Sequence, residues 1–256
     1  MTNLSRPAAA AVGILLVLAG CGGERGPVWV ELEPGLSYAD SIVGTGTEVR
    51  PDDYVVVHYT GFLWADGARG ARFESSVDAG EPIDFPLGRN IVIAGWEKGL
   101  PGMRAGGRRT LLVGPELAFG AVGNPPLIPP DATLCFDIEL LAVPRVEVQV
   151  TEAGDGPVAE LGDNVSVEYT GWLWQDGAAG AEFASSRDRG APFRFTLGAG
   201  QVIAGWDAGI PGLAAGTRAR LVIPAVMGHG REGSPPTVPP AADLVFDIEL
   251  VEIAGK

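Results

Sequence analysis

Histidine and cysteine, the residues that most often ligate metals or act as nucleophiles, are few in this 256-residue sequence, and the aromatic residues are more informative. There are two histidines, His58 and His229, and two cysteines, Cys21 and Cys135, which is too few for the usual sets of metal ligands. We therefore expect no metal and no cofactor. Cys135 lies within an apolar strand pattern and is interpreted as a small buried side chain.

Two acidic residues near the end of the first half could suggest a catalytic carboxylate pair. In residues 136–140 (FDIEL), however, Asp137 and Glu139 alternate with apolar residues, as in a strand with one face toward solvent. We interpret both as solvent-facing side chains, so the chemistry has to come from elsewhere.

The sequence contains an internal repeat with a constant offset of 110 residues. The recurring motifs are Tyr-Thr-Gly at 59 and 169, Val-Ile-Ala-Gly-Trp at 92 and 202, and Phe-Asp-Ile-Glu-Leu at 136 and 246. A repeat of this length is the size of a domain rather than of a solenoid unit. We therefore predict two tandem homologous domains, at residues 36–143 and 144–256, with almost no linker between them.

The local patterns predict strands and one short helix in each copy. Runs of β-branched and aromatic residues at 54–59, 108–113 and 133–142 predict strands, as do the runs at 165–169, 218–223 and 243–253. The helix candidates are residues 93–100 and 203–210, each followed by Pro-Gly. The predicted fold class is α+β, with one helix against a curved antiparallel sheet.

Several motifs, in order, resemble the FKBP-type peptidyl-prolyl cis-trans isomerases. In the first copy they are VVVHYTG (55–61), FESS (73–76), FPLG (85–88), VIAGW (92–96), GMRAGGRR (102–109), FGAVGNPPLIPP (119–130) and ATLCFDIEL (132–140). The second copy has counterparts of most of them. The resemblance implies, for each domain, a half-open antiparallel sheet wrapped on a short helix, with an apolar pocket between them. It implies a folding catalyst, or rotamase, that acts on proline-containing, unfolded or secreted polypeptides.

The resemblance also implies which residues form the pockets. In the first domain the catalytic candidates are Tyr59, Phe73, Glu74, Trp96, Phe119 and Phe136, and the substrate-binding candidates are Phe85, Val92, Ile93, Leu127 and Ile128. In the second domain the substrate-binding candidates are Tyr169, Phe183, Phe193, Val202, Ile203, Trp206, Val238 and Phe246.

Some positions depart from the family pattern. In the first domain Glu74 stands where the family usually has Asp, and Phe119 stands where a tyrosine hydroxyl usually binds the ligand. In the second domain Ala184 removes the carboxylate and His229 takes the tyrosine position. We therefore expect the first domain to be the catalytic unit and the second to be impaired.

The N-terminal segment resembles a bacterial lipoprotein signal. Arg6 precedes a short apolar stretch that ends in Leu-Ala-Gly and Cys21. The resemblance implies cleavage after residue 20, lipidation of Cys21, and a tether over residues 21–35. The alternative is an ordinary signal peptide or an anchor helix. The expected location is the cell envelope, at the outer membrane or the periplasmic face of a bacterial membrane.

The net charge of −14 and the pI near 4.5 exclude the basic footprint of a nucleic-acid-binding protein. The same negative charge disfavours association between copies of the protein, and we predict a monomer. The functional alternative to an isomerase is a non-catalytic chaperone or scaffold that binds proline-containing segments. The Trp-containing insertions at 62–67 and 172–177 predict either longer hairpins or exposed aromatic side chains for client binding.

Overall fold

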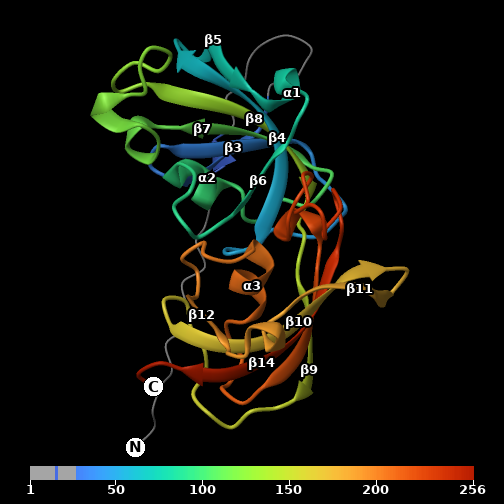
Figure 1. Cartoon of the computed structure of the whole chain (residues 1–256). Helices are drawn as coiled ribbons and strands as arrows, with labels where there is room; N and C mark the ends of the chain where they lie inside the picture. The colour runs from blue at the N-terminus through green and yellow to red at the C-terminus, as the bar shows by residue number, and fades with distance from the viewer. Residues whose placement is uncertain (1–14, 17–26) are drawn as a thin grey trace, which may run out of the picture. The chain divides into compact units, whose positions relative to one another are not determined.

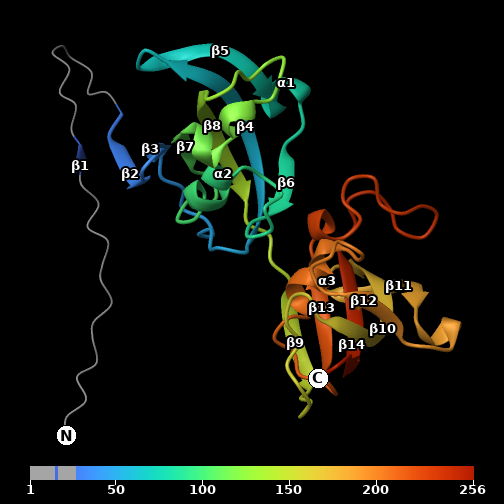
Figure 2. The same ribbon diagram turned by 90° about the vertical axis from the view of Figure 1, so that its left-hand side faces the viewer.

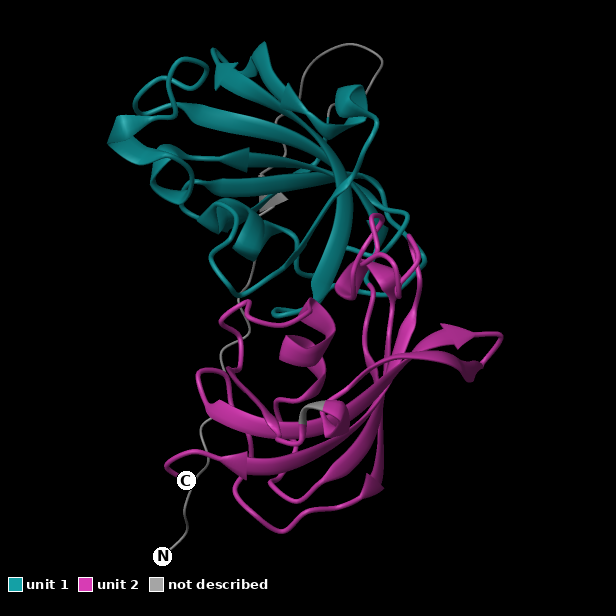
Figure 3. Cartoon of the chain, in the orientation of Figure 1, with its two compact units in different colours: residues 1–143 teal, residues 144–256 magenta. Residues whose placement is uncertain are grey.

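The computed structural model describes residues 15–16 and 27–256, and it consists of two compact units that divide after Val143 (Figure 3). Unit 1 comprises the residues up to Val143, and unit 2 runs from Pro144 to Lys256. Cys21 and most of the expected signal segment lie outside the described residues. In the part that is described, no helix is both long and apolar enough to cross a membrane.

Unit 1 contains an eight-stranded antiparallel sheet (Figures 1 and 2). Along the sheet the order is β1-β2-β3-β7-β8-β4-β5, and β6 pairs with β4. The strands are β1 (Leu15–Leu16), β2 (Trp29–Glu33), β3 (Leu36–Ile42), β4 (Tyr54–Ala65), β5 (Ala68–Ser75), β6 (Ile83–Pro86), β7 (Arg108–Val113) and β8 (Thr133–Ala142). The helices are α1 (Ser76–Ala79) and α2 (Ala94–Gly99), with 3₁₀ turns at Pro115–Leu117 and Gly120–Val122.

Unit 2 repeats this design with a six-stranded sheet in the order β11-β10-β14-β13-β9, and β12 pairs with β10. Its strands are β9 (Glu147–Glu152), β10 (Asn164–Gln175), β11 (Ala178–Ser185), β12 (Phe193–Thr196), β13 (Arg218–Ile223) and β14 (Leu244–Ile253). Its helix is α3 (Ala204–Gly209), and 3₁₀ turns occupy Arg187–Arg189 and Ala225–Met227. The predicted fold class, two α+β units each with a short helix against an antiparallel sheet, is confirmed.

Each sheet has an apolar face toward its helix and a charged face on the other side, as the alternation predicted. On β8, Phe136 and Ile138 are buried, whereas Asp137 and Glu139 form ion pairs on the opposite face. The carboxylates lie 2.5 Å and 3.0 Å from guanidinium nitrogens of Arg69 and Arg108. These acids therefore stabilise the outer face and are not a catalytic pair.

The Trp-containing insertions form the longer hairpins predicted as one alternative. In unit 1 the strands β4 and β5 pair as far as Ala65 and Ala68, and Asp66 and Gly67 between them both have positive φ. Such a two-residue turn suits Asp-Gly because its twist matches that of the strands.

Part of the expected tether is a strand. Residues 29–33 form β2, which pairs with β3 across a turn at Pro34 and Gly35. The ring of Trp29 lies 6.3 Å from that of Trp64 on the hairpin. Backbone pairing and this ring contact hold the segment to unit 1, so only the residues before it can act as a tether.

The short helix of each unit packs against the sheet through a glycine. A Cβ atom on Gly95 would lie 2.3 Å from a methyl of Val113, and one on Gly205 would lie 2.3 Å from a methyl of Ile223. No real Cβ tolerates such distances, so the backbone of each helix approaches the sheet closely enough to exclude a side chain. This close approach brings the next residue, Trp96 or Trp206, into the core of its unit.

Gly95→Ala is expected to lower the free energy of unfolding of unit 1 by about 1–3 kcal/mol because it overpacks the helix–sheet contact. This is opposite in sign to the intrinsic helix preference, which favours alanine over glycine by about 1 kcal/mol. Urea unfolding of the full chain measures the change. In the double variant with Val113→Ala the two effects should be less than additive, because the smaller side chain makes room. Strict additivity would contradict the packing explanation.

Candidate active site

An aromatic cluster surrounds Trp96 on the inner face of the unit 1 sheet. The indole is 3% exposed, and its centroid lies 5.1 Å from the ring of Tyr59 and 5.3 Å from that of Phe136, both edge-to-face. Phe85 lies 5.8 Å away and is tilted by 39°. Edge-to-face contacts of this kind stabilise aromatic clusters beyond their buried area. The helix thus supplies the central indole and the strands supply the rings around it.

Strands β4, β5 and β8 position the rest of the cluster. The ring of Phe73 lies 5.8 Å from that of Phe136, also edge-to-face. Gly61 on β4 faces both rings, and a Cβ atom there would lie 2.5 Å from Phe73. Glycine at this position therefore lets the two rings meet over the strand backbone.

The polar group of this cluster is the hydroxyl of Tyr59, which interacts with the carboxylate of Glu74. Glu74 lies opposite Gly61 in the β4–β5 pairing, on the exposed side of the cluster. Burial raises the pKa of Tyr59 above the ordinary tyrosine value, and the hydrogen bond and charge of Glu74 raise it further. The phenol therefore stays protonated and can act as a donor or acceptor at the edge of an apolar site.

The raised pKa of Tyr59 predicts a loss of stability at alkaline pH. The unfolded chain loses this proton near pH 10, whereas the folded unit retains it, so the free energy of unfolding falls as pH rises above about 10. Below that pH the contribution is fully present. Urea midpoints measured between pH 9 and 11 should fall less steeply for Tyr59→Phe. Glu74→Gln should be intermediate, because burial is the larger cause. An unchanged slope in Tyr59→Phe would contradict this prediction.

Ser76 is a structural residue of the site that sequence reasoning did not single out. Its Oγ accepts a 2.8 Å hydrogen bond from the amide of Tyr59, and it lies 3.0 Å from Nδ1 of His58. Ser186 does the same for the amide of Tyr169 at 2.9 Å in unit 2. These bonds fix the strand that carries the tyrosine. The available signal was the second serine of the Ser-Ser pair, which recurs at the offset of 110.

The remaining candidates of unit 1 lie around the cluster with different exposures. Val92, Ile93 and Phe119 are half-buried and pack on the core, and Ile128 is 3% exposed. Leu127 is 57% exposed, so its side chain is not part of the buried cluster.

Unit 2 has a corresponding cluster around Trp206, which is 4% exposed. The ring of Tyr169 lies 4.9 Å away, that of Phe246 5.3 Å and that of Phe195 5.5 Å. Phe193 lies 6.3 Å from the indole and stands where unit 1 has Ile83. Of the other candidates in this unit, Val238 is buried, whereas Phe183, Val202 and Ile203 are half-buried.

Comparisons with known proteins agree with this geometry. The family model described as FKBP-type peptidyl-prolyl cis-trans isomerase matches residues 46–141 and 156–251. The chain belongs to this family. It is 35% identical over 212 residues to human peptidyl-prolyl cis-trans isomerase FKBP10, which covers 80% of this chain and 35% of that protein.

Two further proteins match different shares of this chain. FK506-binding protein 1 of Debaryomyces hansenii is 47% identical over 108 residues, which is 42% of this chain and 93% of that protein. The crystal structure of the three FKBP domains of wheat FKBP73 covers 87% of this chain and 96% of that chain, at 24% identity and a TM-score of 0.40. The chain spans about a third of the length of the FKBP10 and FKBP9 relatives that it matches.

The two FKBP units differ in the polar groups of their sites. Ala184 lies opposite Gly171 where Glu74 lies opposite Gly61, so the tyrosine of unit 2 has no carboxylate at this position. His229 takes the position of Phe119, and its ring centroid lies 6.5 Å from that of Phe183, edge-to-face. Unit 2 therefore keeps the aromatic cluster but not the tyrosine–carboxylate pair.

The units also differ in the residue that connects the tryptophan-bearing helix to the sheet. In unit 1 the buried guanidinium of Arg109 forms two hydrogen bonds to Asp40, at 2.7 and 3.0 Å, and donates to the carbonyl of Gly99 at 2.7 Å. It also lies 3.9 Å above the ring of Tyr38. In unit 2 the corresponding residue is Ala219. Arg109 thus connects the end of α2 to β3 in one FKBP unit only.

Proposed function

We propose that this chain is a peptidyl-prolyl cis-trans isomerase that acts on unfolded, proline-containing polypeptides, and that unit 1 is the principal catalyst. The observation that carries this proposal is the buried aromatic cluster around Trp96 with the Tyr59–Glu74 pair at its edge. Membership of the family supports the same activity.

The chemistry requires no nucleophile. Rotation about an X-Pro bond must overcome the resonance of the amide, a barrier of about 18–20 kcal/mol, and takes tens of seconds or longer without a catalyst. An apolar site disfavours the charge-separated planar amide relative to the less polar twisted one. Side chains that bind the twisted amide more tightly than the planar one then lower the barrier.

The residues of unit 1 suit these tasks. The face of Trp96 provides an apolar floor for the prolyl ring, and Phe73 and Phe136 exclude water from its sides. The hydroxyl of Tyr59, oriented by Glu74, supplies a hydrogen-bonding group where the carbonyl before proline turns. Unit 2 offers the same apolar surfaces without the carboxylate, which supports a role in holding rather than turning the polypeptide.

The test is isomerisation of a short peptide with one Leu-Pro bond by the full chain. Glu74→Ala is expected to lower kcat/KM about tenfold, since hydrogen bonds to charged groups contribute roughly 1.5–3 kcal/mol. The matched variant Ala184→Glu places the same carboxylate in unit 2 and should raise the activity that remains when Glu74 is absent. No activity in the unmodified chain would exclude the proposal.

A non-catalytic chaperone or scaffold is the second candidate, and specific residues favour it. Phe119 lacks the hydroxyl expected at its position, and Ala184 lacks the carboxylate. If the full chain binds an unfolded proline-containing protein without accelerating isomerisation, and Glu74→Ala leaves this binding intact, the chaperone function replaces the isomerase function.

We further propose that Cys21 is lipidated and anchors the protein in a bacterial cell envelope, at the outer membrane or the periplasmic face of a membrane. The support is the sequence pattern alone, Leu-Ala-Gly before Cys21 after a short apolar stretch. Mass spectrometry of the mature N-terminus should find an acylated Cys21, and Cys21→Ser should release the protein from the membrane fraction. An unmodified Cys21 in membrane-bound protein would exclude this anchor.

A further inference from the structure

Strand β9 forms an edge of the unit 2 sheet, and all six of its residues are exposed. It pairs with β13 on one side, and no strand of the described part of the chain pairs with its other side. An unpaired edge presents a row of backbone N–H and C=O groups that can pair with an added strand. Proteins usually prevent unwanted pairing at such an edge with charged side chains or proline. In β9 the only charged residues are Glu147 and Glu152, at its two ends, and there is no proline or lysine.

Unit 1 shows what covers the same edge there. Its counterpart of β9 is β3, and β2 pairs with β3 through Val30 opposite Tyr38 and Glu31 opposite Ser37. Strand β2 is an extended segment with alternating apolar and charged residues, WVELE. No repeat of this segment precedes β9, because residues 133–142 already form β8. The fold therefore accepts an added antiparallel strand at this position, and unit 2 lacks one among its described residues.

The side chains of β9 indicate which strand would fit. On the face toward the helix, Val148 and Val150 are 39% and 49% exposed, where unit 1 has Tyr38 and Asp40. They leave an apolar surface beside the open edge. A paired strand therefore gains from an apolar residue at every second position.

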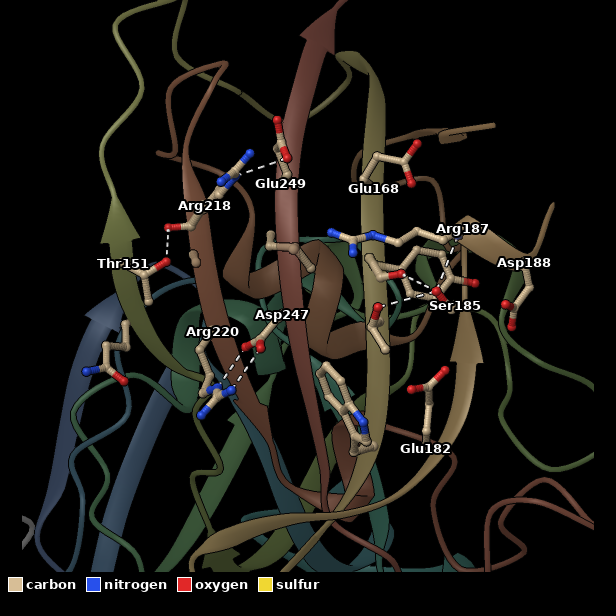
Figure 4. A pocket seen from close by; sticks show the side chains of 16 residues that line it. Thr151, Glu168, Glu182, Ser185, Arg187, Asp188, Arg218, Arg220, Asp247 and Glu249 are labelled. Carbon is tan, nitrogen blue, oxygen red and sulfur yellow. Dashed lines mark hydrogen bonds and ion pairs between the residues drawn. The ribbon is translucent and has the colours of Figure 1, made fainter. Parts of the chain in front are cut away.

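On the opposite face Gln149 and Thr151 line a groove of about 760 Å³ across the sheet (Figure 4). Arg218 and Arg220 in this groove are already paired with Glu249 and Asp247, at 3.1 and 2.7 Å. The groove is also lined by the carboxylates of Glu168, Glu182 and Asp188 and by the guanidinium of Arg187. The carboxylates of this groove lie on β14, β10, β11 and the turn after β11, two or more strands from β9. The carboxylates next to the open edge are Glu147 and Glu152 at the ends of β9, and together with the net negative charge of unit 2 they favour basic residues at the alternate positions of the added strand.

We propose that the free edge of β9 binds an extended segment of a client polypeptide in which apolar and basic residues alternate. This inference rests on the proposed action on unfolded polypeptides. Main-chain hydrogen bonds would provide binding without a fixed sequence, while Val148 and Val150 together with Glu147 and Glu152 would select the alternation. Unit 2 carries fifteen acidic and eight basic side chains, so a second copy of the chain is disfavoured by charge. The segment bound at this edge would be held while unit 1 acts on a proline elsewhere in the same client.

The experiment uses the full chain and a fluorescent peptide of three Lys-Val repeats, with a Glu-Val peptide for comparison. Hydrogen exchange of residues 147–152 should slow when the Lys-Val peptide is bound, and the Glu-Val peptide should bind at least tenfold more weakly. The double variant Val148→Lys/Val150→Lys should weaken Lys-Val binding at least tenfold, because it removes the apolar surface and puts like charge on the edge.

The matched control is Val158→Lys/Leu161→Lys, which adds the same charge to unit 2 at side chains that are 52% and 49% exposed. It should change binding less than twofold. Equal weakening in both variants, unchanged exchange of β9, or a concentration-dependent dimer that protects β9 would overturn the proposal. Isomerisation of the Leu-Pro peptide is measured on the same proteins. Its absence with edge binding intact would refute the proposed function and leave this proposal standing.

Discussion

Replacing Arg109 by alanine is expected to lower the free energy of unfolding of unit 1 by about 3 kcal/mol, as when one partner of a buried ion pair is removed. The guanidinium is 5% exposed and binds both oxygens of Asp40 as well as the carbonyl of Gly99. Without it the partly buried carboxylate of Asp40 has no guanidinium partner there. The carbonyl at the end of α2 loses a donor as well.

Unit 2 supplies the control for this prediction. It has Val148, Val150 and Ala219 where unit 1 has Tyr38, Asp40 and Arg109, and it forms the same sheet. The triple variant that gives unit 1 the unit 2 residues removes the charge together with its partner, and buried ion pairs replaced by apolar groups often lose little stability. We expect it to recover most of the stability that the single variant loses.

The measurement is urea unfolding of the full chain, with hydrogen exchange in β7 to assign the transition to unit 1. A single variant as stable as the unmodified chain would show that Arg109 does not hold the helix to β3. A triple variant as unstable as the single one would show that the guanidinium acts through the helix carbonyls rather than by compensating the charge of Asp40.

The elements that the sequence predicted well are those with strong local patterns. The burial of β8 alternates over Phe136–Leu140 as the apolar pattern indicated, and α2 ends one residue before the predicted end. Because of the repeat, a prediction made for one unit also applies to the other. The β-strand registers of the two units do correspond at the offset of 110. The aromatic candidates around Trp96 came from the family resemblance, because periodicity alone does not separate pocket from core.

What the sequence did not predict depends on partners far along the chain. Arg109 looks like its exposed neighbour Arg108 in sequence, and its burial follows from Asp40, which lies 69 residues away. The Gly and Pro residues around strand β2 predict a tether over residues 21–35, whereas the pairing of residues 29–33 with β3 shows a strand. The open edge of β9 likewise emerges only when the two units are compared, because it consists of a missing neighbour.

The second large effect concerns the floor of the site. Trp96→Leu is expected to lower kcat/KM for the Leu-Pro peptide by up to about tenfold in the full chain. Leucine keeps the position apolar but removes the flat face against which a prolyl ring would pack. Aromatic contacts contribute about 0.5–1.5 kcal/mol beyond buried area, and each 1.4 kcal/mol of lost transition-state binding is a factor of ten.

Trp206→Leu is the matched change, since both indoles are equally buried and lie within similar rings. If unit 1 is the principal catalyst, Trp206→Leu should lower kcat/KM less than twofold. The double variant should then have the same kcat/KM as Trp96→Leu alone. Both variants are compared at a temperature at which hydrogen exchange shows each unit folded, because the smaller side chain also reduces core packing. Equal losses from the two single variants would mean that unit 2 turns over substrate without a carboxylate. Catalysis in this chain would then depend on the aromatic cluster alone, and the Tyr59–Glu74 pair would serve the stability of unit 1 instead.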